Sequence, residues 1–130
     1  MTIREMLHQV ALLTGAAFTK EGARATITIN LPGGRMQRIS GQVTTAREEA
    51  VGLLYTDVGE LDDTIDVRAL LSLNASLRHA RIALFHDTRI VVFAIFDLEQ
   101  ISVRECAPML QEIGAIADEL KRRFFGADID

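Results

Sequence analysis

The hydrophobic positions of the first fourteen residues follow the spacing of an amphipathic helix. Thr2 and Glu5 stand three residues apart, as in a capping box, in which the hydroxyl accepts a helical amide and the carboxylate bonds back to the cap. Gly15 can adopt the left-handed backbone that commonly ends a helix. The sequence therefore predicts a helix between these residues. Its apolar side comprises Ile3, Met6, Leu7, Val10 and Leu13, with Ala11 as an alternative to Val10.

From Arg24 onward the hydrophobic period changes to two, which is typical of strands. Hydrophobic and polar residues alternate over residues 25–31, so this segment is predicted to be a strand with one face exposed to water. The Pro32-Gly33-Gly34 segment is a turn signal, and residues 35–44 are predicted to return as the second strand of a hairpin. A third strand is expected at about residues 49–57.

Acidic residues are concentrated after this third strand, between Asp57 and Asp66. A calcium loop would need oxygen ligands at fixed alternating positions, a central glycine and a closing glutamate, and the spacing here does not supply them. A loop that ends in the N-cap of the next helix explains the acids better, because carboxylates are favoured at the positive end of a helix. That helix is predicted to run from about Thr64 to Leu77.

The two strands predicted next, at residues 79–86 and 89–98, are apolar on both faces. In the second of them, Val91, Phe93 and Ile95 alternate with an equally apolar set on the other face. A strand that is buried on one face only would alternate with polar residues. We therefore expect this part of the sheet to be central and covered on both faces, either by helices or by a partner subunit.

A long helix is predicted from about Ser102 to Phe125. Ser102 and Glu105 have the spacing of a second capping box. Pro108 removes one helical hydrogen bond, so either the regular helix begins nearer Cys106 or its first turn is kinked. The resulting order is helix, three strands, helix, two strands, helix. Hairpins grouped between helices predict an α+β fold with an antiparallel sheet packed against helices.

Composition agrees with one globular domain over residues 1–130. Hydrophobic residues make up 48% of the chain and charged residues 25%, both close to the globular average. The net charge of −4 gives no basic face for phosphates, so nucleic acid is not expected as a partner. Cys106 is the only cysteine, which excludes an intramolecular disulfide and favours a reducing cytoplasm. The longest apolar run, Ile90–Phe96, is far shorter than the ~20 residues of a membrane helix, so no membrane insertion is expected.

The residue types that commonly carry catalysis are not arranged in a known catalytic pattern. His8, His79 and His86 lie on different predicted elements and lack the spacing of a metal site. Cys106 falls on the apolar side of the last helix, where a core role is expected. The segment from Leu31 to Arg35 lacks the Lys-Ser/Thr ending of a phosphate-binding loop and leads into a strand. We therefore expect no enzyme, no metal and no cofactor.

Several segments of the second half resemble the type III secretion chaperone-like superfamily, including its YbjN-like branch. They are LLSLN at 70–74, ARIALF at 80–85 with IVVF at 90–93, and IADEL at 116–120. The first half supports the resemblance by element order alone. The resemblance implies a cytoplasmic, non-catalytic homodimer that binds an extended segment of a secreted protein. The alternative is a YbjN-like regulatory protein, not linked to secretion, that binds a small ligand or a partner.

Candidate binding residues follow from this resemblance. The first helix and the strand at 25–31 are candidates for a groove that accepts the partner chain, whereas the middle helix and the last hairpin are candidates for the dimer interface. An ordinary core role is the alternative for the interface residues. The groove candidates are Met6, Val10, Ile27 and Ile29, and the interface candidates are Leu70, Leu73, Leu77 and Phe93.

Overall fold

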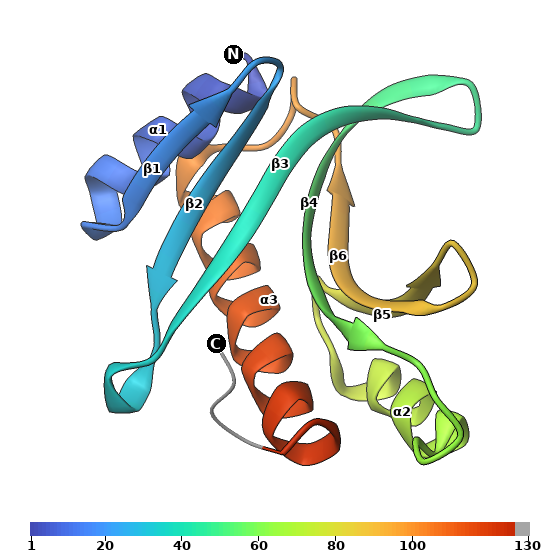
Figure 1. The fold of residues 1–130 in the computed structure, drawn as a ribbon. Helices are drawn as coiled ribbons and strands as arrows, with labels where there is room; N and C mark the ends of the chain where they lie inside the picture. Colours follow the sequence, from blue (N-terminus) through green and yellow to red (C-terminus); the bar gives the residue numbers. More distant parts are fainter. Residues whose placement is uncertain (127–130) are drawn as a thin grey trace.

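Six strands form one antiparallel sheet in the order β1-β2-β3-β4-β6-β5, and three α-helices accompany it (Figure 1). The computed structural model describes residues 1–126. The predicted α+β class with an antiparallel sheet is confirmed. The elements are α1 (Ile3–Thr14), β1 (Ala17–Glu21), β2 (Arg24–Asn30), β3 (Met36–Ala46), β4 (Glu49–Glu60), α2 (Val67–Ser72), β5 (Arg81–Phe85), β6 (Arg89–Phe96) and α3 (Val103–Phe124), with short 3₁₀ turns at Pro32–Gly34 and Leu73–Ser76.

Four strands precede α2, whereas the sequence pattern predicts three. The additional strand is β1, which pairs with β2 around a turn at Gly22. Phe18 is its one partly buried residue, and its ring stacks on that of His8 with the ring centres 4.9 Å apart. β1 is held mainly by backbone pairing, so no alternation of hydrophobic residues marks it in the sequence.

The first helix has the predicted ends. Thr2 Oγ1 accepts a hydrogen bond from the Glu5 amide at 3.1 Å, and a Glu5 carboxylate oxygen accepts one from the Thr2 amide at 3.1 Å. Gly15 ends α1 in the left-handed conformation, and its amide bonds the Ala11 carbonyl. The local signals at both ends of α1 were therefore sufficient to place it.

The last helix begins at Val103, directly after its N-cap Ser102, and runs through Pro108. The alternative start nearer Cys106 is therefore wrong. Pro108 has no amide to donate to the carbonyl of Arg104, four residues earlier. Arg104 is exposed in the first turn of α3, where water can bond a carbonyl, so the loss of one intrahelical hydrogen bond is tolerated.

The middle helix is shorter than predicted. A helix over residues 64–77 is expected from the sequence, whereas α2 ends at Ser72 and a 3₁₀ turn follows. Asp66 is the N-cap, and its Oδ1 accepts a hydrogen bond from the Ala69 amide at 3.1 Å. This bond confirms that the acidic segment ends in a helix cap.

Asn74 ties the 3₁₀ turn to the edge strand β5. Its Oδ1 accepts from the Ile82 amide at 2.7 Å, and its Nδ2 donates to the Ile82 carbonyl at 3.1 Å. The two bonds take the place of a neighbouring strand at this point, so they close part of that edge of the sheet.

Replacing Asn74 with alanine is expected to lower the free energy of unfolding by about 2 kcal/mol, because both backbone groups of Ile82 lose their partners. Chemical denaturation of both proteins measures the difference. Ser76→Ala is the control, since Ser76 makes one exposed hydrogen bond to the Leu73 carbonyl in the same turn. Equal effects of the two substitutions would contradict the role given to Asn74.

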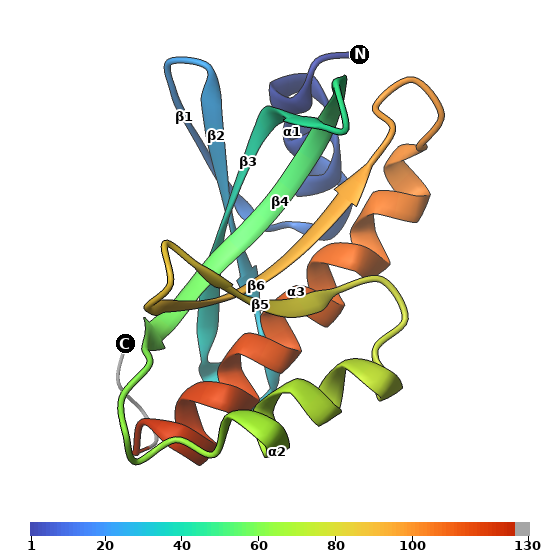
Figure 2. The same ribbon diagram turned by 90° about the vertical axis from the view of Figure 1, so that its right-hand side faces the viewer.

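The helices α1 and α3 lie on one face of the sheet, which we call the inner face (Figure 2). The core lies between these helices and the strands, and α3 packs against β2, β3, β4 and β6. Within residues 1–126, no helix covers the opposite face, which we call the outer face (Figures 1 and 2). Helical cover on both faces of the β5–β6 hairpin, one of the two expectations from the sequence, is therefore wrong.

Candidate functional site

The residues predicted to line a partner-binding groove are buried in the core. Met6 and Val10 of α1 and Ile27 and Ile29 of β2 are each at most 3% exposed. A side chain without exposed surface is not available to another chain. The prediction is corrected, because packing of α1 on β2 fills the space that such a groove would need.

The four predicted interface residues do not share one surface. Leu70 is 1% exposed, and Leu73 and Leu77 are half-buried against the same core. Phe93 lies on the outer face, in register with Tyr55 of β4. The core alternative therefore describes the three leucines, and only Phe93 remains on a surface that another chain could cover.

Hydrophobic side chains gather on the outer face over β4, β6 and β5. Leu53 lies opposite Ile95 in the register of the sheet, and the rings of Phe85 and Phe93 have their centres 5.7 Å apart. Leu53 and Val91 are buried, yet they do not belong to the core under the helices. Ile95 is 46% exposed. We call this group the outer apolar patch, and it consists of Leu53, Phe85, Val91, Phe93 and Ile95.

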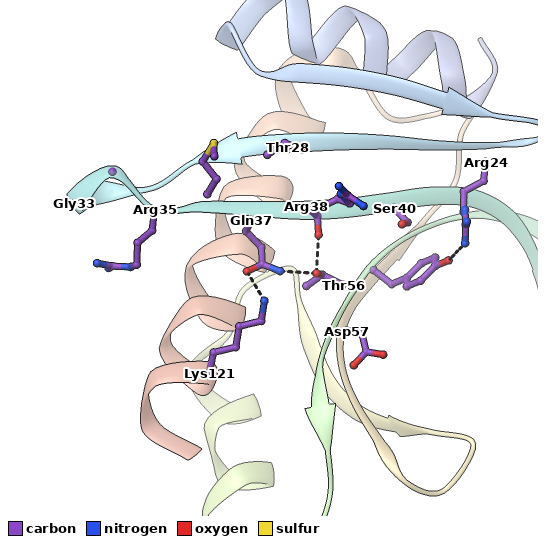
Figure 3. A pocket seen from close by; sticks show the side chains of 13 residues that line it. Arg24, Thr28, Gly33, Arg35, Gln37, Arg38, Ser40, Thr56, Asp57 and Lys121 are labelled. Atoms are coloured by element: carbon purple, nitrogen blue, oxygen red, sulfur yellow. Dashed lines mark hydrogen bonds between the residues drawn. The ribbon is translucent and has the colours of Figure 1, made fainter. Parts of the chain in front are cut away.

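A polar cleft lies where β3 and β4 separate (Figure 3). The two strands pair from Ser40 with Tyr55 to Ala46 with Glu49, and beyond Tyr55 the strand β4 pairs with β6 alone. The register of β4 shifts between Asp57 and Gly59, and a bulge of this kind bends a strand. The cleft has a volume of about 910 Å³, and the side chains around it come from β2, β3, β4 and the end of α3. We call it the β3–β4 cleft.

Buried polar groups join the two strands at the cleft. Gln37 and Thr56 are each 4% exposed. Gln37 Nε2 donates to Thr56 Oγ1 at 2.7 Å, and Thr56 Oγ1 donates to the Arg38 carbonyl at 2.7 Å. Lys121 Nζ reaches Gln37 Oε1 from α3 at 3.3 Å. These bonds replace part of the backbone pairing that β3 and β4 lose where they separate (Figure 3).

The Gly-rich segment at 32–34 stands at one end of this cleft. It joins β2 to β3, as the turn interpretation predicts, and the Leu31 amide bonds the Arg35 carbonyl at 2.8 Å. Gly33 and Gly34 have φ values of 85° and 78°, which favour glycine. The sequence pattern alone does not identify the cleft. One signal was present, because Gln37 occupies an inward position two residues before the core residue Ile39.

The candidate reactive side chains lie apart from this cleft. Cys106 is buried in the core, as predicted, and burial raises the pKa of its thiol to about 12. His8 lies on α1, and His86 lies in the turn between β5 and β6 with a positive φ. Among the described residues, no three His, Cys, Asp or Glu side chains are grouped as metal ligands would be. No helix in this part of the chain is long and apolar enough to cross a membrane.

Comparison with known proteins neither supports nor contradicts the resemblance described above. No model of a known protein family matches the chain. A search of curated proteins likewise finds no match. The type III secretion chaperone-like superfamily therefore stays a prediction from the residues quoted above, beside a fold that is α+β with a six-strand antiparallel sheet.

Proposed function

We propose that this chain is a non-catalytic, homodimeric chaperone or adaptor that binds another polypeptide in the cytoplasm, similar to type III secretion chaperones. The observation that carries the proposal is the outer apolar patch. It lies on three neighbouring strands, and no helix of residues 1–126 covers it. Its accessible members are Ile95, which is exposed, and the partly exposed Phe85 and Phe93, which lie around the buried Leu53 and Val91. Apolar surface of this kind commonly marks a site of protein association.

The proposed cover of the patch is a second copy of this chain. A two-fold axis brings the same surface of both copies together, so an apolar patch meets an apolar patch. The residues of the patch carry no charge that would have to be buried without a partner. A stable dimer would extend beyond the patch, since specific interfaces bury at least ~1,000 Å² in total.

The proposed site for the extended partner segment is the free edge of β1. The opposite edge of the sheet, at β5, is partly closed by the bonds between Asn74 and Ile82. Among residues 1–126, β1 pairs with β2 alone, and four of its five residues are exposed. An extended peptide can add to such an edge through backbone hydrogen bonds, which tolerate many sequences.

Self-association is tested with Ile95→Lys. We expect the wild-type chain to sediment as a dimer at micromolar concentration and the variant to have a dissociation constant at least about 100-fold higher, because a lysine charge would be buried in the interface. Leu12→Lys is the matched control, since Leu12 is 68% exposed on α1, away from the outer face. A wild-type monomer would contradict the proposal, as would equal weakening by both substitutions.

A second candidate function is the regulatory one, in which a YbjN-like protein responds to a small ligand. The β3–β4 cleft favours it, because its volume of about 910 Å³ lies within the roughly 300–1,000 Å³ of small-molecule sites. This candidate requires a ligand whose chemistry matches the side chains of the cleft.

A further inference from the structure

The β3–β4 cleft concentrates positive charge in a chain whose net charge is −4. Four cationic side chains line it, and Asp57 is the one carboxylate among its described lining residues. Asp57 is already paired with Arg89, with distances of 2.7 and 3.0 Å to the guanidinium nitrogens. The cations are Arg24, Arg35, Arg38 and Lys121.

Two of the four cations have carboxylate partners. Arg35 Nε lies 3.0 Å from Asp118, and Arg24 lies 3.4 Å from Glu21 across an exposed turn. An exposed ion pair such as that between Arg24 and Glu21 contributes little to stability.

Within residues 1–126, the other two cations are not neutralised. Among the described residues, neither Arg38 nor Lys121 has a carboxylate oxygen within 4.0 Å. Lys121 Nζ bonds the neutral oxygen of Gln37, and no hydrogen bond involves the guanidinium of Arg38 in this part of the chain. The cleft therefore contains two cations whose charge is available to a ligand.

The remaining polar groups of the cleft suit a ligand that accepts hydrogen bonds. Thr28 and Ser40 contribute hydroxyls, which can donate, whereas the Tyr55 hydroxyl already donates to Gln42 Oε1 at 3.4 Å. Arginine and lysine only donate, and arginine matches the planar oxygen pairs of carboxylates and phosphates. A single phosphate would fill only a small part of about 910 Å³, so the ligand is expected to be larger.

We propose that the β3–β4 cleft binds a small organic anion that carries at least two negative charges, as carboxylates or phosphates, and that Arg38 and Lys121 are its principal charged contacts. The proposal deepens the regulatory candidate and does not depend on self-association. Carboxylates and phosphates share the required chemistry, so the experiment has one arm for each.

The test is isothermal titration of the full chain with citrate in one arm and ATP in the other, at constant ionic strength. We expect at least one probe to bind with a dissociation constant below about 1 mM, and Arg38→Gln to weaken that binding at least tenfold. Arg104→Gln is the matched control, because it removes the same charge from an exposed position at the start of α3. The affinity of Arg104→Gln for the same probe should differ from that of the wild type by less than twofold.

Lys121→Gln is a second variant, and we expect it to weaken binding of the same probe as well. Circular dichroism and sedimentation on the same samples show whether Arg38→Gln keeps its fold and its oligomeric state. The arm that binds identifies the ligand as a polycarboxylate or a polyphosphate. Failure of both probes to bind below about 1 mM overturns the proposal. Equal weakening by Arg38→Gln and Arg104→Gln also overturns it, because it would show attraction to the whole surface and no site.

Discussion

Replacing Leu7 with alanine is expected to lower the free energy of unfolding by about 3 kcal/mol, the usual cost of a buried leucine. Leu7 is completely buried between α1 and the sheet. It fits closely over Gly41 of β3, where an added Cβ would lie 2.6 Å from Leu7 Cδ1. Dense packing on all sides prevents the surroundings from filling the space that the shortened side chain leaves.

Leu13→Ala is the matched control on the same helix. Leu13 is 58% exposed, so the same substitution should change the free energy of unfolding by less than about 0.5 kcal/mol. Urea denaturation followed by circular dichroism measures both values. Similar losses for the two variants would show that α1 does not pack on the sheet through Leu7.

Glu112→Ala is expected to cost about 3 kcal/mol, because one carboxylate on α3 bonds three successive backbone amides. Its oxygens accept from the amides of Arg78, His79 and Ala80 at 2.8, 2.6 and 2.7 Å. Each amide that loses its partner costs roughly 1 kcal/mol, since the site is only partly shielded from water. These bonds fix the chain as it enters β5.

The same bonds predict how stability depends on pH. Burial raises the pKa of Glu112, but the hydrogen bonds from the three amides outweigh it, so the pKa lies below the ordinary 4.5. The unfolded chain then binds the proton more readily than the folded one. The stabilisation is complete above the ordinary pKa and is lost as the pH falls through the lowered one.

Glu112→Gln tests this dependence, because the amide cannot titrate. Stability measured between pH 7 and pH 2.5 should fall less steeply for Glu112→Gln than for the wild type below about pH 4.5. Glu119→Gln, at an exposed position on α3, is the control and should follow the wild type. Glu5 and Asp62 also have lowered pKa values, from bonds with Thr2 and Thr64, so the difference between curves isolates Glu112. Identical slopes for the wild type and Glu112→Gln would contradict the prediction.

Local signals in the sequence determined both ends of α1, the N-cap of α3 and the class of the fold, but not the end of α2. Capping needs only residues within one turn, so Thr2 with Glu5 and Ser102 with Glu105 could be recognised without a structure. The alternation over 25–31 and the doubly apolar hairpin likewise indicated antiparallel strands, and both are present.

Hydrophobic periodicity alone could not show which residues of a helix or strand are covered by other elements. Leu13 continues the apolar spacing of α1, but it is 58% exposed in the last turn. Met6, Val10, Ile27 and Ile29 were proposed as a groove, although the same pattern equally predicts two surfaces packed on each other. Hydrophobic spacing identifies a side that avoids water and does not identify what covers it.

The features with the clearest functional potential were decided by tertiary structure. The β3–β4 cleft exists because beyond Tyr55 the strand β4 stays paired with β6 while β3 stays paired with β2, and its charges come from segments more than eighty residues apart. The doubly apolar hairpin, with Val91, Phe93 and Ile95 on one face, could be recognised in the sequence, yet only the arrangement of the helices shows which of its faces they leave uncovered. A sequence specifies short-range geometry through capping and alternation. Which distant segments lie next to each other depends on strand bending and packing, and these cannot be derived from a short stretch of sequence.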